Sequence, residues 1–163
     1  MAANDVKILG RLPNTRQYRV NDTTTSSDTQ LLVGEPVKVA GNFATHVATA
    51  EPVITAPMLG IVAKASTETS TADGVVDVYV VEPGVTLLET KAHTPANIDS
   101  DAKLLGVLND SVTYDLTTGT YTINEDEGTD PNVHGLQIVD GDIVEGTLSY
   151  VVKGYACEYT SSI

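Results

Sequence analysis

The amino-acid sequence predicts an all-β protein: a small β-barrel or sandwich with an extended N-terminal arm and at most one short helix. Three observations support this fold class. Apolar and polar residues alternate along many segments, β-branched residues crowd the most apolar of them, and turn-forming residues separate the segments at intervals of about ten residues. The chain of 163 residues is long enough for one domain with a core of ordinary size.

The beginning of the chain differs from the rest. Residues 1–30 show no helical period and little alternation, and the segment NDTTTSSDTQ at 21–30 is entirely polar. We therefore divide the chain into an extended N-terminal arm, 1–30, and a β-rich domain, 31–163. Within the arm, QYRV at 17–20 has the pattern of a short strand that can pair with the edge of a partner's sheet.

The expected strands begin at residue 31. The segments LLVGEPVKVAG at 31–41 and PVITAPMLGIVAK at 52–64 carry short apolar runs broken by proline and glycine. In DGVVDVYVVEPGV, which starts at residue 73, three alternating valines share one face, and we expect them in the core: Val76, Val78 and Val80. The Pro83-Gly84 pair that follows fits a type II turn.

The second half of the chain predicts a hairpin, more strands and one helix. SVTYDLTTGTYTIN at 111–124 alternates on both sides of a three-residue connection, 117–119, which ends in glycine. Residues 135–159 supply two or three further strands, with a turn at Asp140-Gly141. The only helix that the pattern supports is DSDAKLL at 99–105, which a glycine follows.

Charge is distributed unevenly along the chain. The first 20 residues hold four basic residues against one acidic residue, whereas residues 21–163 hold five lysines against 21 acidic residues. An acidic domain argues against nucleic-acid binding, and no apolar run is long enough to cross a membrane. We expect the basic arm to touch an acidic partner.

No catalytic constellation is evident in the sequence. His46, His93 and His134 are far apart, and we expect them to be solvated loop residues. Cys157 has no base near it in sequence and is expected to be a small, half-buried side chain. Hydrolase, dinucleotide and phosphate-binding motifs are missing. We therefore expect no enzymatic activity, no cofactor and no metal.

Two acidic clusters offer oxygen atoms that calcium could bind. The segment NEDEGTDPN at 124–132 fails the spacing of an EF-hand loop, because Gly128 would require the loop to start at Ile123. The segment DGDIVE at 140–145 is explained by a turn between strands. Solvated loops are the simpler interpretation of both clusters.

The order of these segments resembles that of a known family. The segments DGVVDVYVVEPGV and DLTTGTYTI carry most of the likeness, which covers about residues 10–152 and resembles the small β-rich decoration, or cement, proteins on the heads of tailed bacteriophages. The resemblance implies a structural virion protein, made in the host cytoplasm and bound to the capsid exterior. It also implies that the protein stabilises contacts between major capsid protein subunits as a homotrimer at three-fold or quasi-three-fold positions.

The charge distribution suggests which residues attach such a protein. We predict that the first part of the arm, about residues 1–25, is the main capsid anchor, with Arg11, Arg16 and Arg19 pairing with carboxylates. Tyr18 and Val20 are predicted to supply apolar contact and a strand edge. The alternative function is a carbohydrate-binding or adhesin-like β-domain of a fibre or surface layer. The seven tyrosines support this alternative, because sugar sites often use aromatic side chains, and the lack of tryptophan argues against it. Nothing in the sequence favours a third possibility, a small β-fold hydrolase.

Overall fold

The computed structural model describes residues 5–23, 30–126 and 128–158, and they form two five-stranded antiparallel sheets and a separate hairpin. Across the first sheet the order is β1 (Lys7–Leu9), β7 (Leu87–Lys91), β12 (Thr147–Val152), β11 (Leu136–Asp142) and β8 (Ser111–Val112). Across the second sheet the order is β2 (Thr15–Val20), β6 (Gly74–Val80), β5 (Gly60–Lys64), β3 (Pro36–Ala40) and β4 (Phe43–His46). The hairpin consists of β9 (Tyr114–Thr117) and β10 (Thr120–Ile123). The prediction of an all-β fold is confirmed.

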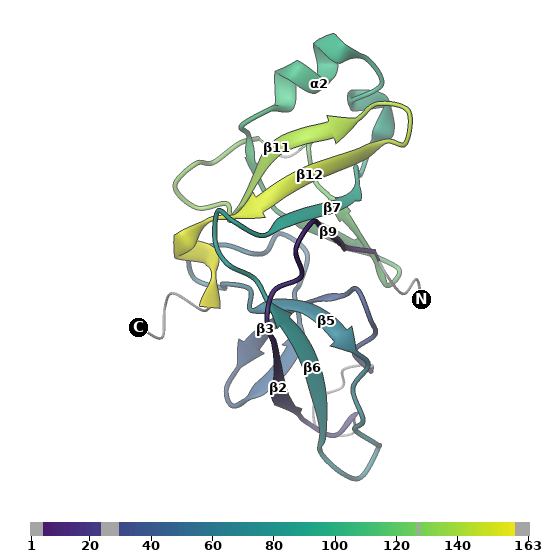
Figure 1. Ribbon diagram of the computed structural model, residues 1–163, viewed down its shortest axis with the longest axis vertical. Helices are drawn as coiled ribbons and strands as arrows, with labels where there is room; N and C mark the ends of the chain where they lie inside the picture. Colours follow the sequence, from purple (N-terminus) through teal and green to yellow (C-terminus); the bar gives the residue numbers. More distant parts are fainter. Residues whose placement is uncertain (1–4, 24–29, 127, 159–163) are drawn as a thin grey trace.

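The two sheets form two lobes, which are stacked along the long axis of the molecule in Figure 1. Strand β1 pairs with β7 in the first sheet, and β2 pairs with β6 in the second. The chain therefore passes from one sheet to the other in two neighbouring places, through residues 10–14 and through residues 81–86. The Val80 N–H donates to the carbonyl oxygen of Asn14, 3.0 Å away, where the two connectors meet the second sheet.

The valine-rich segment forms β6, which is paired on both sides, with β2 and with β5. Val76, Val78 and Val80 are 1%, 0% and 7% exposed, so the prediction that they belong to the core is confirmed. The Val85 N–H donates to the Glu82 carbonyl oxygen across the Pro83-Gly84 pair, and Gly84 has a φ of 71°. The expected turn is therefore present where the chain leaves β6 for the first sheet.

Each lobe has its own hydrophobic core. The core of the first lobe lies between the first sheet and the β9–β10 hairpin, and at its centre three tyrosine rings are almost fully buried: Tyr114, Tyr121 and Tyr150. The second core is smaller and consists mainly of valines from β2, β3, β5 and β6. The chain has no tryptophan and one phenylalanine, so the tyrosine rings are the large aromatic side chains of this core.

The second sheet curls until its two edge strands approach each other. The Arg19 guanidinium on β2 lies 5.0 Å from the centre of the Phe43 ring on β4, at the opposite edge of the sheet. The same guanidinium forms an ion pair with Asp73, at 3.0 Å. Arg19 therefore contributes to closing the seam of its own sheet.

The N-terminal residues are not an arm separate from the body. Val6 is 3% exposed and belongs to the first core, and the strand β1 that follows it is paired with β7. All six residues of β2 pair with β6. The proposed division into an arm of 1–30 and a domain of 31–163 therefore does not describe residues 5–23, which contribute one strand to each sheet. Residues 24–29 of the polar segment lie outside the described residues.

Two predictions of local turns need correction. The hairpin loop has two residues rather than three, since Thr117 pairs directly with Thr120, and Thr118 and Gly119 both have the positive φ that a type I′ turn requires. Asp140 and Gly141 lie within β11, and the chain turns only after Asp142, whose carboxylate accepts the Val144 and Glu145 N–H groups at 2.8 and 2.9 Å. The predicted turn residue is thus part of a strand with an irregular register.

The short helix is present but begins and ends two residues later than expected. Helix α2 spans Asp101–Val107 and continues through Gly106, because Leu104 and Val107 pack against the first core. Two 3-10 turns also occur among the described residues, at Pro95–Asn97 and Gly154–Ala156. No helix among the described residues has the length and apolar character that crossing a membrane requires.

Candidate functional site

Three hollows of the protein surface lie along the two connectors between the lobes, and we refer to them together as the trough. Neighbouring hollows share lining residues: Leu9 and Leu12 line two of them, and Asn14 and Glu82 line another two. The largest hollow has a volume of about 330 Å³ and lies between β1 and the strands β5 and β6. The trough therefore follows residues 7–16 from the edge of one sheet to the edge of the other.

Three of the nine exposed large apolar side chains among the described residues line this trough. Leu12 is 54% exposed, Val85 is 71% exposed and Val33 is 36% exposed. Leu12 lies between Gly10, which has a φ of 76°, and Pro13, so the connector turns away from both sheets and leaves the leucine without a strand opposite it. Gathered apolar side chains of this kind mark a surface that contacts another molecule more often than isolated ones do.

The charged residues of the trough are mainly basic, although the chain as a whole carries a net charge of −13. Lys7, Arg11 and Arg16 line it, against the single carboxylate of Glu82. Neither Lys7 nor Arg11 forms an ion pair with another described residue. The trough is thus a locally cationic surface with apolar contents.

The structure brings only some of the predicted anchor residues to this surface. Arg11 and Arg16 are exposed and line the trough. Arg19 points toward Asp73 and Phe43 at the seam of the second sheet, Tyr18 packs half-buried against the second core, and Val20 is 5% exposed inside that core. The Val20 side chain is therefore part of the chain's own core, which does not fit the apolar contact with a partner that was predicted for it.

Sequence reasoning missed the apolar part of the trough. Leu12 stands in a short segment between Gly10 and Pro13, and Val85 comes directly after the Pro83-Gly84 turn. A large apolar residue within or beside a turn is the only signal in the sequence, and it is weak because single exposed apolar residues are common. Their proximity depends on the strand pairing that joins the two connectors, which the sequence pattern did not reveal.

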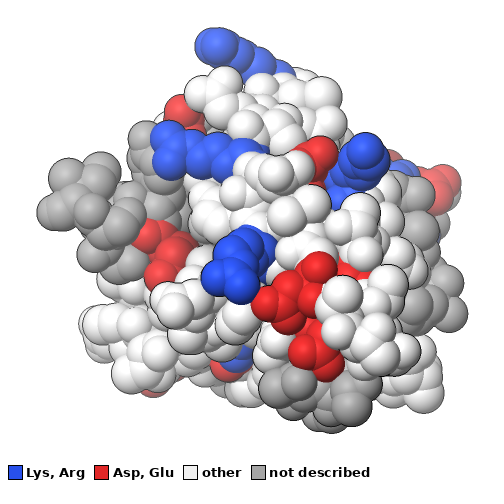
Figure 2. Space-filling model, turned by 90° about the horizontal axis from the view of Figure 1, so that it is seen from below, with Lys and Arg blue, Asp and Glu red and all other residues white. Residues whose placement is uncertain are grey.

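The end of the molecule formed by the second sheet carries no continuous basic patch among its described residues. Figure 2 shows Lys and Arg side chains that stand apart from one another between uncharged residues, with a cluster of acidic side chains beside one of them. A surface that binds nucleic acid usually gathers its cations along one face. The described part of this end therefore has little of the electrostatic character of a nucleic-acid interface.

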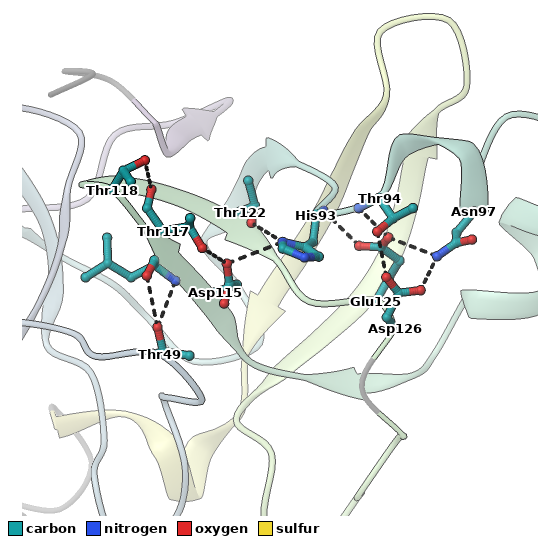
Figure 3. A network of polar contacts seen from close by, with 11 residues as sticks. Thr49, His93, Thr94, Asn97, Asp115, Thr117, Thr118, Thr122, Glu125 and Asp126 are labelled. Atoms are coloured by element: carbon teal, nitrogen blue, oxygen red, sulfur yellow. Dashed lines mark hydrogen bonds and ion pairs between the residues drawn. The ribbon is translucent and has the colours of Figure 1, made fainter.

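A line of polar side chains along the hairpin could be mistaken for a catalytic site (Figure 3). The His93 Nδ1 atom lies 3.3 Å from a carboxylate oxygen of Asp115 and 3.4 Å from the hydroxyl of Thr122. A relay needs the acid at one ring nitrogen and the nucleophilic hydroxyl at the other. Because the same nitrogen faces both groups, this arrangement does not activate Thr122.

The acidic cluster at the end of the same hairpin has a structural role. The Glu125 carboxylate accepts the backbone N–H groups of His93 and Thr94 at 2.9 and 2.7 Å, and Asp126 accepts the Thr94 hydroxyl at 2.6 Å and the Asn97 amide. Glu125 is only 8% exposed, so its expected place in a solvated loop is wrong. These carboxylates bind the segment after β7 to the hairpin, and no group of three or more His, Cys, Asp or Glu among the described residues is placed to hold a metal ion.

The remaining candidate residues also serve the fold. His46 Nε2 lies 3.1 Å from a carboxylate oxygen of Glu35, whose side chain is 1% exposed, so His46 is not a solvated loop residue. His134 Nδ1 contacts the Ser111 carbonyl oxygen at 3.0 Å. Cys157 is 1% exposed, with its Sγ 3.5 Å from the Val81 carbonyl oxygen, and it is more deeply buried than expected.

No protein-family model matches the chain, and comparisons with curated proteins and with solved structures found no match. The functional interpretation therefore depends on the residues and geometry of the chain itself. Within the described residues, the trough is a surface at which exposed apolar side chains and cations that lack an ion-pair partner, Lys7 and Arg11, occur together.

Proposed function

We propose that this chain is a structural virion protein, a decoration or cement protein that binds the outer surface of a tailed-phage capsid. It acts by binding alone and stabilises contacts between major capsid protein subunits. A molecule that binds only the assembled shell adds its binding free energy to that state. This function requires contact area and a fixed orientation, and it requires no cofactor or chemical step.

The observation that carries the proposal is the trough between the lobes. It combines exposed leucine and valine side chains with three cationic side chains on a protein that is otherwise acidic. Such a combination suits contact with another protein, because the apolar groups favour burial and the cations favour an acidic surface. The resemblance in segment order to phage decoration proteins makes a capsid the proposed location of that acidic surface.

We further propose that the bound protein is a homotrimer at three-fold or quasi-three-fold positions. Three copies related by symmetry present the same surface to three equivalent capsid subunits, so one small chain can match the symmetry of the shell. The mass of shell-bound protein per three-fold position checks this arrangement. Isolated single copies in a reconstruction of decorated heads contradict it.

The carbohydrate-binding alternative is less well supported by the positions of the tyrosines. Flat sugar rings are usually bound on exposed aromatic side chains, but three tyrosine rings are fully buried: Tyr114, Tyr121 and Tyr150. Tyr155 is 37% exposed, and its hydroxyl lies 2.9 and 2.7 Å from the carbonyl oxygens of Pro131 and His134, which hold the ring against the surface. No described tyrosine therefore combines high exposure with a free ring face.

Co-sedimentation with undecorated heads tests the proposed function. The purified chain should pellet with heads of the phage that encodes it, saturate at a fixed number of copies per shell and raise the temperature at which the shells break open. A glycan array serves as the comparison, because a lectin is retained on sugars and a cement protein is not. Failure to pellet with heads, together with retention on glycans, overturns the proposal in favour of the alternative.

A further inference from the structure

We propose that the trough binds an extended, carboxylate-bearing and partly apolar peptide segment of the partner protein. This inference rests on the proposed function for the identity of the partner, which is the capsid subunit. It goes beyond that function by assigning the binding surface and the chemistry of the segment that fits it. Arg11 and Arg16 are the cationic recognition residues, and Leu12 and Val85 are the apolar contacts.

The shape of the trough favours an extended occupant. Its hollows follow the chain from residue 7 to residue 16, and neighbouring hollows share lining residues, so an extended segment that runs beside these residues contacts them in succession. One side of the trough includes β1, the edge strand of the first sheet. Extended peptides commonly bind along such strand edges.

The charge of the trough determines the sign of the partner segment. Three of its four charged residues are cationic: Lys7, Arg11 and Arg16, against Glu82. The chain as a whole carries a net charge of −13, which disfavours the approach of an acidic partner, whereas the cations of the trough favour it locally. Guanidinium groups also bind carboxylates in a planar, two-point geometry that a lysine does not offer.

The apolar contents determine the second property of the segment. Leu12 and Val85 project from the two connectors on either side of the same hollow and are 54% and 71% exposed. An occupant that covers them removes apolar surface from water, whereas a purely acidic peptide does not. A partner segment in which carboxylate and apolar side chains alternate can pair with the cations of the trough and also cover Leu12 and Val85.

Two pairs of variants test the assignment in the intact chain. Arg11→Ser with Arg16→Ser removes the proposed recognition cations, and Lys64→Ser with Lys103→Ser removes two exposed cations elsewhere. Leu12→Asp places a carboxylate in the trough. Its control, Leu105→Asp, places a carboxylate on α2, at a leucine that is 68% exposed. All six positions changed in these variants and their controls are exposed, so the variants should fold, which circular dichroism and a urea melt verify.

Binding to undecorated heads should separate the variants from their controls. The double arginine variant should bind about tenfold more weakly than the parent, because two charge-assisted contacts are lost. Leu12→Asp loses an apolar contact, and its binding should be weakened by at least the same factor. Both control variants should bind like the parent. If the parent pellets with heads and the trough variants bind equally well, the proposed function stands and this inference is wrong.

A synthetic peptide tests the inference without the capsid. A ten-residue peptide that alternates glutamate and valine should shift the backbone amide resonances of residues 7–16 at low salt, and the same peptide with glutamine in place of glutamate should shift them far less. The double arginine variant should lose the difference between the two peptides. Equal effects of both peptides, or shifts confined to another surface, contradict the inference whether or not the chain binds heads.

The occupant could also be a second copy of the chain, and sedimentation of the free protein distinguishes this case. If the parent forms an oligomer at micromolar concentration and Leu12→Asp converts it to a monomer, the trough is an interface between copies, and the proposal of a partner segment is overturned. An unchanged oligomeric state in both trough variants, combined with weaker binding to heads, supports the proposal.

Discussion

The hydroxyl network in the first core makes a quantitative prediction about stability. The Tyr150 hydroxyl lies 2.8 Å from the Tyr114 hydroxyl and 2.6 Å from the Thr90 hydroxyl, and all three side chains are buried. Burial is the main cause that raises the pKa of both Tyr114 and Tyr150, so both hydroxyls stay protonated throughout the ordinary pH range. Replacing either tyrosine with phenylalanine removes a hydroxyl and preserves the ring.

The two replacements should have unequal costs. Tyr150→Phe deprives two buried hydroxyls of a partner, and at about 1–2 kcal/mol for each lost contact the free energy of unfolding should fall by about 2–4 kcal/mol. Tyr114→Phe removes one contact and leaves Tyr150 bonded to Thr90, so its cost should be about 1–1.5 kcal/mol. The double variant removes the shared contact only once, and its cost should therefore be smaller than the sum of the two by about 1 kcal/mol.

Urea unfolding followed by far-ultraviolet circular dichroism measures the four proteins of this cycle, and the chain has no tryptophan whose signal the replacements would alter. The slopes of the four transitions should agree, which shows that the compactness of the unfolded state has not changed. If the cost of the double variant equals the sum of the two single costs to within about 0.3 kcal/mol, the Tyr114 and Tyr150 hydroxyls do not interact. If the two single variants have equal costs, the hydrogen bond between Thr90 and Tyr150 does not contribute to stability.

Three further predictions concern stability. Val78→Asp should unfold the second lobe, because it buries a carboxylate at a position that is 0% exposed; a urea transition like that of the parent contradicts the assignment of β6. Gly60→Ala should cost about 3 kcal/mol or more in the same assay, since the new Cβ would lie 2.0 Å from the Tyr79 carbonyl oxygen, whereas Gly106→Ala on α2 meets nothing within 4 Å and should be neutral or stabilising. Asp5 has a raised pKa, mainly because burial disfavours its charge and also because of Glu35, so its contribution to stability is present below about pH 4 and is lost as the pH rises through the raised value. Asp5→Asn should therefore gain stability over the parent from pH 4 to pH 7, and a difference that does not depend on pH contradicts this.

The sequence predicted those parts of the fold in which a local pattern and tertiary burial agree. The alternating valines of β6 are buried because the strand is paired on both sides and covers a core, so their pattern and their environment match. The Pro83-Gly84 turn and the hairpin were predictable for a similar reason, since their glycines have positive φ values that the backbone requires there. Helix α2 was found, with its ends displaced because packing on the first core decides where it stops.

The contribution of the N-terminal residues to the sheets could not be read from their pattern. Strand β1 has only three residues, too few for an alternation to be recognised, and β2 is an edge strand with four of its six residues exposed. An edge strand with polar side chains looks like a loop in the sequence. The roles of Glu125 and Asp142 were missed because carboxylates that accept backbone N–H groups have the same composition as carboxylates in water.

The division of the predicted anchor residues follows from the alternation of a strand. Val20 points into the second core, and Tyr18, two residues earlier, packs against the same core. Arg16 lies two residues earlier again, at the end of the strand where the core stops, and so its side chain emerges beside the trough. Arg19 occupies the opposite face, where its ion pair and its contact with Phe43 hold the seam of the sheet, and a serine there should weaken the fold itself. The arginines near the N-terminus therefore have different positions: Arg19 belongs to the seam of its own sheet, whereas Arg11 and Arg16 lie exposed beside the trough.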